Sequence, residues 1–151
     1  MSIETGVVLN LHGEPIYWHV PAERSFAFLP DSRDLWDVLW SRRDEVGGFA
    51  HTHPGEGMPA PSSTDVTTFG AIESGLGKCL DWWILSSDCY VHYLKGGTPT
   101  GGAIYCEGSA SLVDKYALVE LGFYRLPRHG FAFIGINEKP WMKRLHQLSY
   151  A

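Results

Sequence analysis

The chain has 151 residues, of which 44% are hydrophobic and 19% charged, and its formal net charge at pH 7 is −5. This length and balance are typical of one globular domain and exclude wholesale disorder. The acidic balance, with no Lys/Arg cluster in the sequence larger than Arg42-Arg43, argues against a nucleic-acid partner. No apolar run approaches the roughly 20 residues that span a bilayer, so no membrane partner is expected.

The cysteines and the N-terminus indicate a compartment. Cys79, Cys89 and Cys106 form neither a Cys-x-x-Cys pair nor an even set, which favours a reducing environment over a disulfide framework. The first Lys or Arg is Arg24, so the charged start of a secretion signal is missing. These observations predict a cytoplasmic protein.

The first part of the chain predicts a hairpin, a helix and a third strand. Residues 5–11 and 15–20 are β-branched and apolar, and residues 12–14 between them are expected to form the turn. Asp31 or Ser32 can cap a helix whose apolar positions recur at i, i+4 spacing, namely Leu35, Trp36, Leu39 and Trp40. Gly47-Gly48 is expected to end this helix before an extended segment at 49–53.

The second part predicts a helix after a Pro/Gly-rich loop at 54–61. Ser62, with an acid three residues later, predicts a helix start, and this helix should end near Gly75. Strands are then expected at 81–85, 89–94 and 131–136, helices at 111–121 and 140–148, and a flexible loop at 96–102. The pattern predicts an α/β chain of the α+β kind, a single domain over 1–151 with a mixed sheet flanked by helices.

The segment HTHPGEGMPAPSSTD, residues 51–65, is the most informative stretch of the sequence. His51 and His53 alternate on an extended segment, so both imidazoles point to one side of the strand end. Asp65 on the first turn of the next helix offers a carboxylate to complete the set. Two nitrogens and one carboxylate oxygen suit Zn²⁺, and three protein ligands leave a fourth position for water, as in a catalytic site.

These residues resemble the pattern of the JAMM (JAB/MPN+) metalloproteases, which is a Glu, then H-x-H, usually followed by Pro, then S-x-x-D about ten residues later. The resemblance covers roughly residues 4–94 and implies a JAMM/MPN-type fold with one zinc ion. It implies that His51, His53 and Asp65 are the zinc ligands and that Ser62 helps to stabilise the oxyanion. Glu4, which begins the stretch E-T-G-V-V-L, matches the catalytic Glu on an early strand.

Two departures from the family pattern concern the loop and the start of the chain. Eleven residues separate His53 from Asp65, and the extra one falls in the Pro/Gly loop, where length costs little. Family members usually carry a helix before the Glu strand, whereas residues 1–3 alone precede Glu4 here. Either a C-terminal helix from residues 95–151 covers that face, or Glu4 is held loosely and Glu14 is the alternative base.

The resemblance implies hydrolysis by a zinc-activated water, with Glu4 moving its proton and Ser62 donating to the carbonyl oxygen. The expected function is a zinc-dependent isopeptidase or protease that cleaves after the C-terminal tail of a ubiquitin-like protein, in deconjugation or precursor processing. The partners would be the ubiquitin-like protein or its conjugates and associated conjugation enzymes. Processing of a sulfur-carrier protein with amino-acid release, and a non-catalytic MPN scaffold, are the alternatives.

Overall fold

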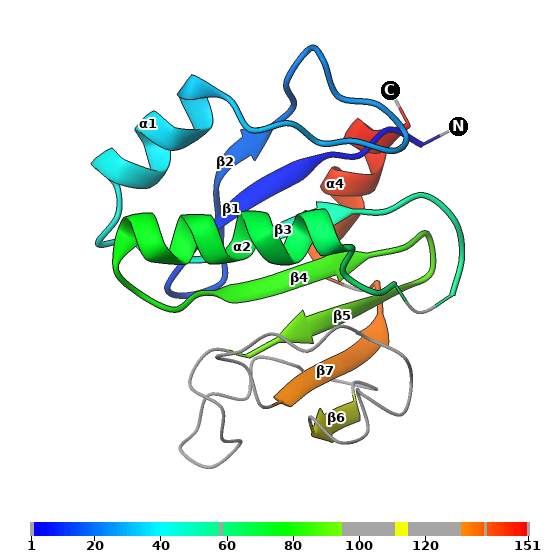
Figure 1. Ribbon diagram of the computed structural model, residues 1–151. Helices are drawn as coiled ribbons and strands as arrows, with labels where there is room; N and C mark the ends of the chain where they lie inside the picture. Colours follow the sequence, from blue (N-terminus) through cyan, green and yellow to red (C-terminus); the bar gives the residue numbers. More distant parts are fainter. Residues whose placement is uncertain (1, 58, 95–110, 115–130, 138, 151) are drawn as a thin grey trace.

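The computed structural model describes residues 2–57, 59–94, 111–114, 131–137 and 139–150 (Figure 1). Its strands are β1 (Gly6–Asn10), β2 (Pro15–His19), β3 (Val46–Thr52), β4 (Asp81–Leu85), β5 (Cys89–Tyr93), β6 (Ser111–Asp114) and β7 (Phe131–Ile136). The described residues also form three helices: α1 (Arg33–Ser41), α2 (Ser63–Leu76) and α4 (Pro140–Ser149). The fold is therefore α+β, as the sequence predicted, in one domain.

The described strands form one seven-stranded mixed sheet in the order β2-β1-β3-β4-β5-β7-β6. Helix α2 connects β3 to β4, which run parallel, whereas the other neighbouring strands in the described ranges are antiparallel. A crossover helix is the usual way to join two parallel strands, since a tight turn cannot do so. As a result, the end of β3 and the start of α2 lie at the same edge of the sheet.

Alternation along the strands gives the sheet a hydrophobic core on each face. Val8, Phe49 and Trp82 pack with α1 and α2 on one face, whereas their strand neighbours Val7 and Ala50 pack with α4 on the other. Figure 1 agrees, since α2 crosses the near side of the sheet and α4 lies behind it. None of the helices in the described ranges has the length and hydropathy needed to cross a bilayer.

Two sequence predictions about secondary structure were wrong. Gly47 and Gly48 lie inside β3 and do not end a helix; a Cβ on Gly47 would lie 2.6 Å from the backbone oxygen of Asn10, so glycine is required there by close backbone approach. Residues 111–114, expected to be helical, form β6 and pair with β7. The rest of the predicted helix at 111–121 and the loop at 96–102 lie outside the described residues.

The remaining elements were predicted within a few residues, and their ends follow from local chemistry. Ser32 caps α1 by accepting a hydrogen bond from the Leu35 N–H at 3.1 Å. Helix α2 continues past Gly75 to Leu76, and Gly77 ends it with a left-handed φ of 69°.

A substitution at Leu39 tests the packing of the core beneath α1, because the Leu39 side chain is fully buried in the cluster that joins α1, α2 and the sheet. We expect Leu39→Ala to lower the free energy of unfolding by about 2–5 kcal/mol, measured by urea denaturation followed by circular dichroism. Asp37→Ala on the same helix is the control, since Asp37 is exposed and its pair with Arg33 spans 3.9 Å; its effect should stay within about 0.5 kcal/mol. Equal losses in both variants would contradict this packing.

Candidate metal centre

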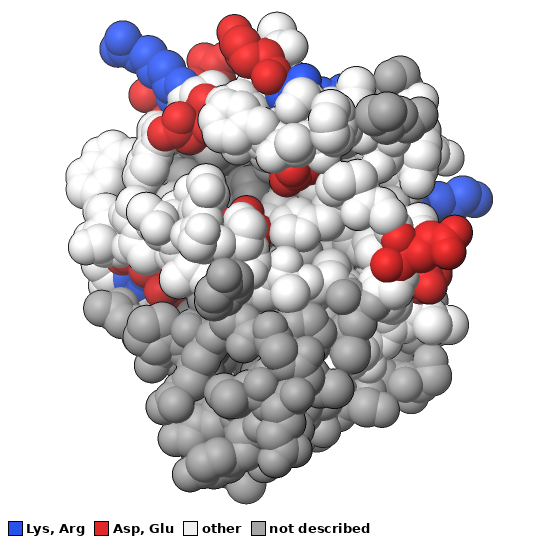
Figure 2. Space-filling view, turned by 45° about the vertical axis from the view of Figure 1, so that its right-hand side comes forward, with Lys and Arg blue, Asp and Glu red and all other residues white. Residues whose placement is uncertain are grey.

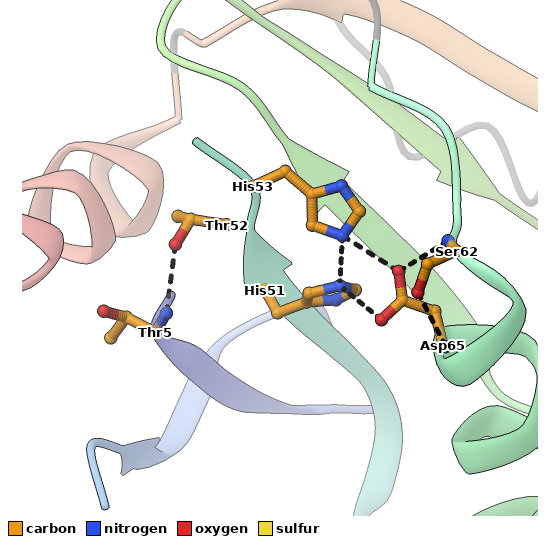
Figure 3. A network of polar contacts seen from close by, with 6 residues as sticks. All are labelled: Thr5, His51, Thr52, His53, Ser62 and Asp65. Carbon is orange, nitrogen blue, oxygen red and sulfur yellow. Dashed lines mark hydrogen bonds and ion pairs between the residues drawn. The ribbon is translucent and has the colours of Figure 1, made fainter. Parts of the chain in front are cut away.

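The end of β3 presents two imidazoles to one point. His51 is the penultimate residue of β3, and His53 follows the strand, where its N–H donates to the Leu85 carbonyl oxygen of β4 at 2.7 Å. Their Nε2 atoms lie 3.0 Å apart (Figure 3). Two neutral imidazoles at this distance share a single hydrogen position between them, so a cation bound beside both nitrogens would satisfy both lone pairs at once.

The start of α2 brings a carboxylate to the same point through its N-cap. Ser62 accepts a hydrogen bond on Oγ from the Asp65 N–H at 3.0 Å, and the Ser62 N–H donates to Asp65 Oδ2 at 2.9 Å. This is a capping box, in which the two residues satisfy each other's backbone donors. The same carboxylate contacts both imidazoles, with Oδ2 at 2.9 Å from His53 Nε2 and Oδ1 at 3.2 Å from His51 Nε2.

These separations fit a tetrahedral metal site. Zinc–nitrogen bonds of 2.0–2.1 Å at tetrahedral angles place neighbouring donor atoms about 3.3 Å apart. The three contacts among His51, His53 and Asp65 measure 2.9–3.2 Å, close to that value. The residues predicted from the sequence as metal ligands are therefore brought together by the fold.

Charge states in the centre also favour a cation. Burial lowers the pKa of His51, which leaves its imidazole neutral with a lone pair available at pH 7. For Asp65, burial opposes ionisation, but the hydrogen bonds to His51 and His53 outweigh it and hold the pKa of this carboxyl well below its usual range. The centre therefore offers a neutral nitrogen donor on His51 and an ionised carboxylate on Asp65, beside the second imidazole of His53, which matches the donor set predicted for zinc.

Glu4 lies beside the two imidazoles and is 8% exposed. Its ligand atom and those of His51 and His53 all lie within 4.8 Å of one another, so these three residues form a buried group that can hold a metal ion. Asp65 contacts both imidazoles at 2.9–3.2 Å, whereas no ion pair within the described residues joins Glu4 to either of them, which favours Asp65 as the direct ligand. Burial raises the pKa of Glu4 to about 7.

Strand pairing and the C-terminal helix explain how Glu4 is held. Gly6 pairs with His51 in the antiparallel β1–β3 ladder, and continuing that register places Glu4 opposite His53. The Glu4 N–H donates to the Ser25 oxygen at 2.9 Å, and the preceding Ile3 N–H donates to Ser149 in α4 at 2.7 Å. Of the two alternatives considered from the sequence, the structure therefore shows the first, in which a C-terminal helix, α4, contacts the segment that carries Glu4.

Glu14 does not contribute to the centre. Its side chain is exposed in the β1–β2 turn, at the opposite end of β1 from Glu4. Its N–H donates to the Asn10 side chain at 3.0 Å, which is the structural role of a turn residue. The alternative base considered from the sequence is therefore excluded by the direction of the strand.

The metal centre opens into a cavity of about 400 Å³. The cavity is lined by Glu4, Ser62 and the three metal-site residues, and by an apolar wall from residues 26–30 that includes Phe26 and Phe28. Figure 2 shows acidic side chains within a hollow whose surroundings are largely uncharged. This wall was not predicted from the sequence. The run FAFLP between a strand and a helix is nevertheless a usable signal, since apolar residues in a loop need a surface to cover.

A scan against models of known protein families and a search of curated proteins find no match to this chain. The motif is compact, since its residues come from one strand end and one helix start.

Asp65 distinguishes the two possible ligand sets. We expect about one zinc per chain in the wild type by mass spectrometry and a loss of zinc in Asp65→Ala, because the buried imidazoles then lack their nearest carboxylate. Glu56→Ala is the control, since Glu56 is an exposed acid in the loop before α2 and should keep the metal. Full zinc in Asp65→Ala together with loss in Glu4→Ala would instead make Glu4 the third ligand.

Proposed function

We propose that this chain is a zinc-dependent metallopeptidase of the JAMM type that cleaves after the C-terminal tail of a ubiquitin-like protein. The observation that carries the proposal is the convergence of His51, His53 and Asp65 at 2.9–3.2 Å beside the buried Glu4. Three protein ligands leave a position for water, whereas a structural zinc is usually closed by four, often thiolates. The same convergence disfavours a non-catalytic MPN scaffold, which has no need of a complete ligand set.

The chain's own residues divide the chemistry between them. Zinc, when bound, supplies a Lewis acid for the scissile carbonyl and makes a water molecule more acidic. Glu4 lies where it can accept the proton of the attacking water and return it to the leaving amine. The Ser62 Oγ accepts the Asp65 N–H, so its own proton is available to donate to the carbonyl oxygen as negative charge develops there.

The cavity supports a peptide tail as the substrate. Its described lining contains the carboxylates of Glu4, Asp31 and Asp65 and neither Lys nor Arg, so a phosphate backbone would be repelled. An extended tail of small residues can bring a carbonyl to the metal centre past the apolar wall, whose aromatic members Phe26 and Phe28 are 54% and 51% exposed. A ubiquitin-like protein or its conjugate, supplied by conjugation enzymes, fits this description.

Processing of a sulfur-carrier protein uses the same site and is the alternative substrate. Both classes of protein present a small-residue C-terminal tail, so the metal centre alone favours neither. Cleavage of a large fusion after the tail favours deconjugation, whereas release of a single C-terminal amino acid, with the large fusion left intact, favours the sulfur-carrier reaction.

Glu4→Gln tests the base. The amide keeps the size of the side chain but cannot take a proton, so we expect zinc content at the wild-type level and a fall in kcat of about 10²–10⁴-fold. The measurement is single-turnover cleavage of a ubiquitin-like fusion, with metal content determined on the same sample. Cleavage by this variant at the wild-type rate would contradict the role of Glu4 as base but would not contradict the proposed metal centre.

Ser62→Gly separates capping from catalysis. Glycine at an N-cap costs only a few tenths of a kcal/mol relative to serine, so the variant should unfold close to the wild-type temperature. Loss of the hydroxyl donor should nevertheless lower kcat by about 10²–10³-fold while zinc is retained. Unchanged kcat in a stable, zinc-loaded variant would restrict Ser62 to its role as the cap of α2.

A further inference from the structure

Two threonines adjacent in sequence to the metal-centre residues pair with each other behind it. Thr5 follows Glu4, and Thr52 lies between His51 and His53. The Thr5 N–H donates to Thr52 Oγ1 at 3.0 Å, and the Thr52 N–H donates to the Thr5 oxygen at 3.0 Å. Figure 3 shows this pair on the opposite side of the strand end from the imidazoles, as strand alternation requires.

Helix α4 completes this pair with a third hydroxyl. Ser149 Oγ lies 3.0 Å from Thr52 Oγ1, 3.1 Å from Thr5 Oγ1 and 3.0 Å from the Leu145 oxygen. The exposed fractions of Thr5, Thr52 and Ser149 are 0%, 2% and 1%, so water does not compete for these bonds. The Ser149 oxygen also accepts the Ile3 N–H at 2.7 Å, one residue before Glu4.

One arrangement of protons satisfies every hydroxyl in this cluster. Thr5 donates to the Ile3 oxygen at 2.9 Å, Thr52 donates to Ser149 Oγ, and Ser149 donates to Thr5 Oγ1, with the Leu145 oxygen as a second acceptor at 3.0 Å. Each hydroxyl then also accepts: Thr5 Oγ1 accepts from Ser149 and from the Arg24 guanidinium, Thr52 Oγ1 accepts the Thr5 N–H, and Ser149 Oγ accepts from Thr52. A buried polar network that is fully satisfied holds its members in one geometry, whereas a partly satisfied one is costly.

We propose that Ser149 is a positioning residue for the metal centre: through Thr5 and Thr52 it fixes the start of the β1 segment against the end of β3, and so sets the Glu4 carboxylate relative to His51 and His53. The proposal rests on the proposed function, because it assigns Ser149 a role only if Glu4 acts beside a bound metal. The cluster reaches Glu4 through the Thr5 and Ile3 backbones and reaches the imidazoles through Thr52, without contacting substrate.

The test uses the visible spectrum of Co²⁺ bound in place of zinc, which needs no substrate and reports on the surroundings of the ion. We expect Ser149→Ala to bind Co²⁺ within about threefold of the wild-type affinity and to shift the spectrum toward that of Glu4→Gln. Met142→Ala is the matched control, because it also removes a fully buried contact of α4 but no hydroxyl of the cluster. Its spectrum should remain that of the wild type.

Thr52→Val removes the hydrogen bond between Thr52 and Ser149 from the Thr52 side, at nearly constant side-chain volume. It should shift the spectrum in the same direction as Ser149→Ala. With a fusion that the wild type cleaves, both variants should lower kcat by about tenfold or more at unchanged KM, because a small misplacement of a catalytic group has a large effect on rate.

The outcomes separate the two proposals. A wild type that binds no Co²⁺ overturns the proposed function. Co²⁺ binding with wild-type spectra in Ser149→Ala and Thr52→Val overturns the positioning role alone, as does an equal shift in Met142→Ala. If neither hydroxyl variant folds while Met142→Ala does, the cluster is a folding element and the positioning role is likewise overturned.

Discussion

The carboxylate of Asp65 is the group on which the rest of the site depends. It accepts the Ser62 N–H at 2.9 Å to begin α2, and it contacts both imidazoles at the end of β3. A negative charge in the first turn of a helix is also stabilised by the helix dipole. The start of α2 and the candidate metal centre therefore share the Asp65 carboxylate. The position of the helix along the sheet is fixed by the same atoms that would bind the ion.

The pKa values of two carboxylates in one cavity, Asp65 and Glu4, are shifted in opposite directions by their surroundings. Asp65 is ionised because the hydrogen bonds to His51 and His53 outweigh its burial, whereas Glu4 has a pKa of about 7 because burial dominates. Such a separation is how enzymes assign different roles to chemically similar groups. It fits the roles proposed above, in which Asp65 is a constant ligand and Glu4 exchanges a proton near neutral pH.

The sequence predicted most elements, and the candidate ligands that the fold brings together, because those signals are local. The alternation of His51 and His53 and the cap-to-acid spacing at Ser62 and Asp65 each involve only a few residues. Three features depended on distant partners and carried no local signal. Gly47 in β3 allows close backbone approach to Asn10, β6 is a strand only because β7 pairs with it, and Ser149 reaches Thr5 across 144 positions of sequence.

Alternation on the strands also protects the register of the site. A slip of one residue between β1 and β3 would exchange the faces, turning Thr5 toward the metal centre and Glu4 toward α4. The face under α4 is lined by Leu145, Met142 and other apolar residues, so a carboxylate there would lose its hydration without gaining a cation. Thr5 forms a hydrogen bond with the hydroxyl of Ser149 on that face, and a glutamate at its position would bring an unpaired charge there. The side of the sheet away from the candidate metal centre therefore helps to decide which residues face that centre.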